Sequence, residues 1–252
     1  MPDQLDRLLR IMKTLRSPNG CDWDRAQTFE TIVPHTIEEA YEVADAVERG
    51  DVDDIRHELG DLLFQVVFQS RIAEESGLFA FNDVARSIAD KLEARHPHVF
   101  GDPATAADPG ADRWEALKAA ERASKGATSA MEGVAVALPA LLRADKLQKR
   151  AARVGFDWPD CAGPANKVAE EMAELAAATA DQRAEEAGDL LFAAVNLVRA
   201  YGIAPEDALR GANAKFERRF RQMEALADGK FTELTLEQQE ALWQAVKRGE
   251  KS

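Results

Sequence analysis

Residues 58–64 read Glu-Leu-Gly-Asp-Leu-Leu-Phe, and residues 186–192 read Glu-Ala-Gly-Asp-Leu-Leu-Phe. Further motifs repeat in the same order around these two stretches. The repeated pairs are Gly20-Cys21-Asp22-Trp23 with Gly155-Phe156-Asp157-Trp158, Glu38-Glu39-x-x-Glu42 with Glu170-Glu171-x-x-Glu174, and Lys91-Leu92-Glu93-Ala94-Arg95 with Lys215-Phe216-Glu217-Arg218-Arg219. Blocks that recur in a constant order are typical of a duplicated structural unit. The sequence therefore predicts two copies of one domain.

Helical periodicity runs through both copies. Near the N-terminus, apolar residues recur at the i, i+3, i+4, i+7 spacing of one helix face. These residues are Leu5, Leu8, Leu9, Met12 and Leu15. Further along, Pro34 and Gly50 predict a helix over 34–49, and Gly77 ends a helix over about 52–76. Another helix opens at Phe81 and stops before Pro97. Alternating, strand-like runs are nearly absent, so the sequence predicts an all-α protein.

These signals predict two tandem helical-bundle domains, over residues 1–100 and 137–252. The segment between them, residues 101–136, is rich in Ala, Pro, Gly, Asp and Ser. Such a composition is typical of a linker. We expect one short helix inside the linker, around Trp114 to Ala123, and a basic helix after Pro139.

The charge balance limits the classes of partner. The chain has 252 residues and a formal net charge of −13, so most of its surface repels nucleic acid and anionic membranes. No apolar run is long enough to span a bilayer, and the N-terminus lacks the apolar core of a signal peptide. Cys21 and Cys161 lie far apart without metal-ligand spacing, which argues against disulfides and zinc. We expect a cytoplasmic protein that binds neither nucleic acid nor a membrane.

The acidic motifs have the spacing of a metal site. Residues at i and i+3 share one face of a helix, so Glu171 lies beside Glu174, and Glu186 lies beside Asp189. A short connection makes successive helices antiparallel neighbours, which lets the two pairs face each other. Four converging carboxylates repel one another unless a cation binds them. Oxygen ligands favour Mg²⁺, with Mn²⁺ as a substitute, over zinc. The equivalent ligands in the first half are Glu39, Glu42, Glu58 and Asp61.

A magnesium ion held in this way predicts chemistry on phosphates, because such an ion takes up substrate phosphate oxygens. Glu170, or another carboxylate of the cluster, is the candidate general base for an attacking water. Lys215 and Arg219, at i and i+4 on a later helix, are candidates for binding the remaining phosphate oxygens. Trp243 is a candidate for stacking on a nucleobase, with a core or interface position as its alternative. The expected catalytic residues are Glu170, Glu171, Glu174, Glu186 and Asp189.

These motifs resemble the signature of the MazG family, the nucleoside triphosphate pyrophosphohydrolases of the all-α NTP pyrophosphatase superfamily. The family's Glu-Glu-x-x-Glu…Glu-x-x-Asp pattern occurs in both halves. The resemblance extends to residues 21–24, 95–100 and 212–220 and covers nearly the whole chain, being weakest over about 102–136. It implies attack of water at the α-phosphorus of NTPs or dNTPs, release of pyrophosphate, dependence on Mg²⁺ and a dimer. It also implies a substrate-binding role for Asn213, which belongs to the family's Asn-x-Lys-Phe pattern.

The two halves differ in a way that favours the second as the catalyst. Asn213 aligns with Ala89 of the first half, and the first half has a longer insertion between its acidic motifs. We expect the C-terminal site to be the more competent one. The N-terminal site is then weak, selective or structural.

There are three alternatives to this predicted function. One is a non-catalytic regulator that binds nucleotide and metal, and another is a pyrophosphatase with a narrower substrate, such as dUTP or phosphoribosyl-ATP. The third, a di-iron bundle, needs Glu-x-x-His on two helices, and Asp61 and Asp189 stand where histidine is required. Because the outer apolar stripes of the helices need cover, we also expect a homodimer.

Overall fold

The computed structural model describes residues 2–101, 119 and 126–250 of the chain. Helices make up the ordered elements of these residues, and no strand occurs among them, so the all-α prediction is confirmed. The chain divides into two compact units, Met1–Leu117 (unit 1) and Lys118–Ser252 (unit 2). The short helix expected around Trp114 to Ala123 lies, apart from Ala119, outside the described residues.

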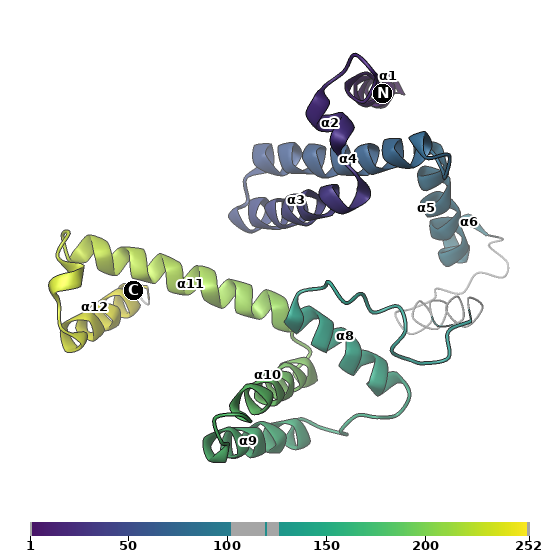
Figure 1. Ribbon diagram of the computed structural model, residues 1–252. Coiled ribbons are helices and arrows are strands. Elements are labelled where there is room, and N and C mark those ends of the chain that lie inside the picture. Colours follow the sequence, from purple (N-terminus) through teal and green to yellow (C-terminus); the bar gives the residue numbers. More distant parts are fainter. Residues whose placement is uncertain (1, 102–118, 120–125, 251–252) are drawn as a thin grey trace. The chain divides into compact units, whose positions relative to one another are not determined.

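Unit 1 is built around a pair of long helices (Figure 1). Its helices are α1 (Pro2–Leu15), α2 (Asp22–Ala26), α3 (Phe29–Arg49), α4 (Val52–Glu75), α5 (Phe81–Arg95) and α6 (Pro97–Phe100). Gly50 ends α3 with φ of 71°, a left-handed conformation that glycine adopts without steric cost. Asp51 then caps α4 by accepting a hydrogen bond from the Asp54 amide at 3.1 Å. This tight connection lays α3 and α4 side by side and antiparallel.

Helix α3 begins five residues before the expected start at Pro34. Thr28 and Thr31 form a capping box, in which each side chain bonds the backbone of the other. This box provides hydrogen-bond partners for backbone N–H groups at the start of the helix and fixes that start at Phe29. Pro34 therefore lies inside the helix, where it removes one backbone hydrogen bond but does not end the element. The prediction from proline alone was wrong because it ignored the cap upstream.

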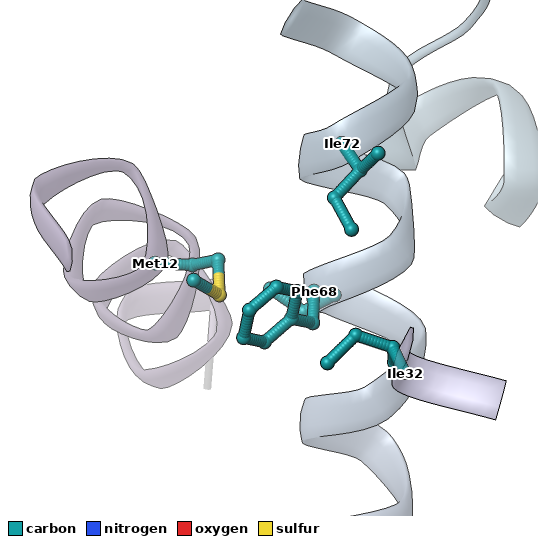
Figure 2. Close-up of a cluster of buried hydrophobic side chains, with 5 residues drawn as sticks. Met12, Ile32, Phe68 and Ile72 are labelled. Atoms are coloured by element: carbon teal, nitrogen blue, oxygen red, sulfur yellow. The ribbon is translucent and has the colours of Figure 1, made fainter. Parts of the chain in front are cut away.

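The core of unit 1 lies between α1, α3 and α4. Figure 2 shows Met12 of α1 directed at Phe68 of α4, with Ile32 and Ile72 on either side of the ring. All four side chains are buried, together with Val67. The Phe68 ring makes edge contacts with Phe64, at 5.6 Å between centroids, and with Trp23, at 6.4 Å. Phe68 of α4 thus contacts side chains from α1, α2 and α3.

We expect Phe68→Ala to destabilise unit 1 by about 3–5 kcal/mol, because truncating a buried phenylalanine loses apolar burial and leaves a cavity. Urea unfolding followed by circular dichroism measures the change. Phe100→Ala, at a position 62% exposed, is the matched control and should change the free energy of unfolding by less than about 0.5 kcal/mol. Equal effects at the two positions would contradict the assigned core.

Unit 2 repeats the antiparallel pair and adds a long projecting helix (Figure 1). Its helices are α8 (Ala140–Arg153), α9 (Ala162–Ala177), α10 (Arg183–Ala200), α11 (Pro205–Leu226), the 3-10 turn η1 (Phe231–Glu233) and α12 (Leu236–Gly249). Glu206, at the start of α11, accepts a hydrogen bond from the Leu142 amide at 3.2 Å and so ties α11 to α8. Within the described part of the chain, no single helix is long and apolar enough to cross a membrane, although the bent pair α10–α11 passes the same test on length and composition.

Candidate active site

Each antiparallel pair brings three carboxylates together. In unit 1, one oxygen from each of Glu39, Glu42 and Glu58 lies within 4.8 Å of the other two. In unit 2, the same holds for Glu171, Glu174 and Glu186. In both groups two residues come from the first helix of the pair and one from the second, as the i, i+3 spacing predicts. Such convergence of oxygen atoms is suited to a divalent cation.

The electrostatics of the two groups reflect crowded negative charge. Partial desolvation raises the pKa of Glu39, and the charges of Asp61 and Glu42 raise it further. Desolvation, and after it the Glu42 charge, raises the pKa of Glu58. In unit 2, desolvation and the neighbouring Glu171 charge raise the pKa of Glu174. A bound cation would offset this repulsion in either unit.

The fourth expected ligand of each site stands just outside the group of three. Asp61 and Asp189 are one helical turn beyond Glu58 and Glu186, respectively. Asp61 acts on both Glu39 and Glu58 through its charge. Asp189 lies in the wall of a cavity that also includes Glu171. Each aspartate is therefore adjacent to the three glutamates of its unit but is not one of the three converging carboxylates.

Lys167 is a site residue that the sequence analysis missed. Its ammonium lies 2.8 Å from Glu170 and 2.6 Å from Glu171, and these carboxylates raise the pKa of Lys167 above its ordinary value. Glu170, the expected general base, is thereby held at the edge of the cluster. The signal was present in the sequence, because Lys167 precedes the glutamates by three and four residues, the spacing of helix ion pairs. In unit 1, His35 precedes Glu38 by the same three residues, and their side chains lie 3.7 Å apart.

A cavity of about 400 Å³ opens beside the carboxylates of unit 2. Its apolar wall comes from Phe156, Trp158 and Phe192, and its polar side includes Lys167, Glu171 and Asp189. Apolar cavities with a few convergent polar groups are the usual form of a small-molecule site. The aromatic wall and the charged wall therefore suit a ligand with a ring at one end and, at the other, anionic groups paired with a cation.

Gln148 is a buried polar residue in the wall of this cavity. Its side chain is buried, and its Nε2 donates to the Phe192 carbonyl at 2.9 Å. Because a carbonyl only accepts, this bond sets the orientation of the amide. The Gln148 Oε1 has no hydrogen-bond partner among the described residues. A buried polar atom left without a partner is costly, so this amide is held at the cavity wall at a cost in stability.

The loop that carries Trp158 is anchored to α10. Arg199 binds Asp157 through two nitrogens at 2.6 and 3.0 Å and also donates to the Asn196 Oδ1. This ion pair lowers the pKa of Asp157. At the start of α9, a Cβ on Gly163 would lie 2.0 Å from the Trp158 ring, so glycine is required for the indole to pack there. The aromatic wall is therefore held in place by α9 and α10.

In unit 1 the corresponding space is occupied by the protein's own side chains. The repeated motif aligns Ala193 and Asn196 of α10 with Gln65 and Phe68 of α4. Phe68 is fully buried against Trp23, which aligns with the cavity residue Trp158. Gln65 is also buried, and its Nε2 donates to Glu39 at 3.3 Å. Unit 1 therefore has the same cluster of three glutamates, but its core side chains lie where unit 2 has its cavity.

The residues expected to bind substrate on α11 and α12 are not brought to the carboxylates. Arg219 binds the carboxylate of Glu250 at 2.6 Å, and its guanidinium lies 5.4 Å from the Trp243 ring. Asn213 and Lys215 are exposed on the middle of α11. We call α11 from Asn213 onward, together with α12, the α11–α12 arm. The arm gathers the expected residues with one another but outside the cavity, whose walls come from other parts of unit 2.

Comparisons with known proteins agree with this geometry. Residues 27–100 match the profile described as the MazG nucleotide pyrophosphohydrolase domain. The chain is 52% identical over 261 residues to the nucleoside triphosphate pyrophosphohydrolase of Escherichia coli (strain K12), covering 98% of each chain. It is 44% identical over 253 residues to the nucleoside triphosphate pyrophosphohydrolase/pyrophosphatase MazG of Thermotoga maritima, covering 98% of this chain and 97% of that protein. With its paired carboxylate helices and this similarity along nearly its whole length, the chain belongs to the MazG nucleotide pyrophosphohydrolase family.

Proposed function

We propose that the chain hydrolyses nucleoside triphosphates to nucleoside monophosphates and pyrophosphate, with catalysis in unit 2. The observation that carries the proposal is the cavity of about 400 Å³ whose wall includes both Glu171 and an aromatic surface. A triphosphate at the carboxylate end would place its nucleoside against Phe156 and Trp158. The names of the E. coli and T. maritima relatives support the same reaction.

The carboxylates of unit 2 fit a hard divalent ion. Glu171, Glu174 and Glu186 offer oxygen atoms at mutual distances within 4.8 Å, with Asp189 one turn away, and this all-oxygen set favours Mg²⁺ or Mn²⁺ over softer metals. When bound, such an ion polarises the phosphorus and offsets charge on the leaving pyrophosphate. In unit 1, Glu39, Glu42, Glu58 and Asp61 would hold an ion in the same manner.

The protein's own groups account for the remaining chemistry. A carboxylate of the cluster, or Glu170 at its edge, takes the proton of the water that attacks the α-phosphorus. Lys167 places a positive charge beside Glu171, where it can bind a phosphate oxygen. The aromatic wall of Phe156 and Trp158 can stack on any base, which favours broad use of NTPs and dNTPs over strict selection of one base.

We also propose that residues 1–100 and 137–252 are two copies of the family domain, joined by a linker over 101–136. The supporting observation is the pair of carboxylate groups, α3 with α4 and α9 with α10, built from aligned residues. In unit 1, His35 replaces Lys167 and Phe68 replaces Asn196. These differences favour a non-catalytic, metal-binding role for unit 1.

The reaction is tested by measuring pyrophosphate release from a panel of NTPs and dNTPs, with Mg²⁺, with Mn²⁺ and with EDTA. We expect release that depends on the metal and is matched mole for mole by nucleoside monophosphate, because the carboxylates alone cannot offset the charge of the triphosphate. The order of rates along the panel names the preferred substrate, including a narrow one such as dUTP. Nucleotide binding without any turnover would instead establish a regulatory protein.

A further inference from the structure

Arg199 of α10 joins two other residues in the wall of the unit 2 cavity. Its guanidinium donates to both carboxylate oxygens of Asp157, at 2.6 and 3.0 Å, and to the Asn196 Oδ1 at 2.6 and 3.1 Å. The Arg199 side chain is 12% exposed and that of Asp157 is 32% exposed, and all three residues line the cavity. A two-point contact between arginine and a carboxylate fixes orientation as well as distance. Arg199 therefore fixes the Asp157 carboxylate against α10.

The fixed carboxylate acts on the backbone of the next residue. Asp157 Oδ1 also accepts a hydrogen bond from the Trp158 amide at 3.0 Å. Trp158 belongs to the connection between α8, which ends at Arg153, and α9, which begins at Ala162. Connections are more mobile than the helices they join, so the place of the Trp158 indole depends on side-chain contacts such as this one.

Unit 1 has the same residue types but not the same contact. Asp157, Trp158 and Arg199 align with Asp22, Trp23 and Arg71. Arg71 pairs with Glu74 and Glu75 of its own helix, each at 2.8 Å, and the Asp22 side chain is 97% exposed. The unit 2 residues aligned with these two glutamates are Gly202 and Ile203. Arg199 therefore has no acidic competitor at those positions, and its contact with Asp157 occurs in the unit that has the cavity.

We propose that Arg199 is a positioning residue for the nucleoside of the substrate. By holding Asp157, it fixes the Trp158 indole as the surface on which the nucleobase stacks, and it does so without touching the nucleotide. Stacking of one base on an aromatic side chain is worth roughly 5- to 150-fold in affinity. The triphosphate is unaffected, because it lies at the carboxylates of α9 and α10. This proposal rests on the function proposed above, since it concerns the nucleoside of that substrate.

The test compares full-length Arg199→Ala, Asp157→Ala and the double variant with the wild type. Titration calorimetry in Mg²⁺ measures the Kd of α,β-methylene-ATP, which cannot be cleaved at the reacting bond, and the Kd of inorganic tripolyphosphate, which has no base. We expect each single substitution to raise the Kd of the analogue about tenfold. The double variant should raise it no further, because both residues act through one contact. The Kd of tripolyphosphate should keep its wild-type value.

A second readout follows the indole directly. The chain has four tryptophans, and in protein labelled with 5-fluorotryptophan the fluorine NMR signal of Trp158 is the one lost in Trp158→Phe. This signal should shift in Arg199→Ala and in Asp157→Ala. Asp157→Ala leaves the bonds between Arg199 and Asn196 in place, so it tests the contact even if Arg199→Ala unfolds unit 2. Arg71→Ala, the aligned change in unit 1, is the matched control and should alter neither the signal nor the two Kd values.

The other outcomes overturn the proposal in distinct ways. If the Trp158 signal does not shift in either variant, the contact does not place the indole. If the Kd of the analogue keeps its wild-type value, the place of the indole does not govern nucleoside binding. If the Kd of tripolyphosphate rises by the same factor as that of the analogue, the ion pair has only a general structural role. If the effects of the two substitutions multiply in the double variant, the residues act separately. Failure of the proposed function is separate, since it would appear as a wild-type protein without metal-dependent pyrophosphate release.

Discussion

Glu186→Ala should reduce pyrophosphate release by more than about 100-fold, because it removes a direct oxygen ligand, and even the loss of a partner outside the ligand shell costs about 10–100-fold. Glu186 is the only contribution of α10 to the group of three oxygens in unit 2. Without it, the cluster keeps Glu171 and Glu174 from α9, and α10 retains only Asp189, one turn away. Steady-state rates at saturating Mg²⁺, together with Mn²⁺ affinity, measure the effect.

The matched control for this prediction is Glu58→Ala, the equivalent change in unit 1. We expect it to spare most of the turnover, since core side chains fill the space where a nucleoside would bind beside that cluster. Both variants lose one carboxylate from a group of the same geometry. A large loss in Glu58→Ala with little loss in Glu186→Ala would reverse the assignment of catalysis to unit 2.

The convergence of three glutamates in each unit follows from local geometry. Spacing of i and i+3 on a helix determines which side chains share a face, and the short turn at Gly50 fixes α3 and α4 as neighbours. The three glutamates of each group needed no further information. The start of α3 was missed for an equally local reason, since the capping box of Thr28 and Thr31 outweighs the preference of Pro34 for a first turn.

The cavity was beyond the reach of sequence patterns because it depends on how α8, the Trp158 loop and α10 pack together. Phe156 and Gln148 are far from the acidic motifs in the chain, and neither has a spacing that points to a ligand. The contrast between Asn196 and Phe68 is visible in the aligned motifs, but its meaning appears only when Phe68 is found buried against Trp23. The place of Lys215 and Arg219 on a separate arm likewise follows from the 102° change of direction between α10 and α11.

Asn196→Phe should close the cavity of unit 2 as Phe68 fills the corresponding space in unit 1. Asn196 lies in the cavity wall near Phe192 and Trp158, so a phenyl ring there would take the volume that a nucleoside needs. Stacking of a base on aromatic side chains is worth about 1–3 kcal/mol, and losing that contact predicts a fall in kcat/KM of about 5- to 150-fold. Steady-state kinetics with the preferred triphosphate measure this change.

Two readouts separate the filled cavity from general damage to the site. Asn196→Ala loses the same hydrogen bond with Arg199 but adds no volume, so it should keep most of the affinity for nucleotide. Inorganic tripolyphosphate, which has no base, should inhibit Asn196→Phe and the wild type with similar constants, because the carboxylates on α9 and α10 are unchanged. Mn²⁺ affinity should also be unaffected in both variants.

A wild-type KM in Asn196→Phe would show that the nucleoside binds outside this cavity. Equal losses of kcat/KM in Asn196→Phe and Asn196→Ala would assign the effect to the lost hydrogen bond with Arg199. The expected pattern would instead show that a single aromatic side chain in α4 or α10 decides whether a carboxylate pair of this fold admits a nucleotide.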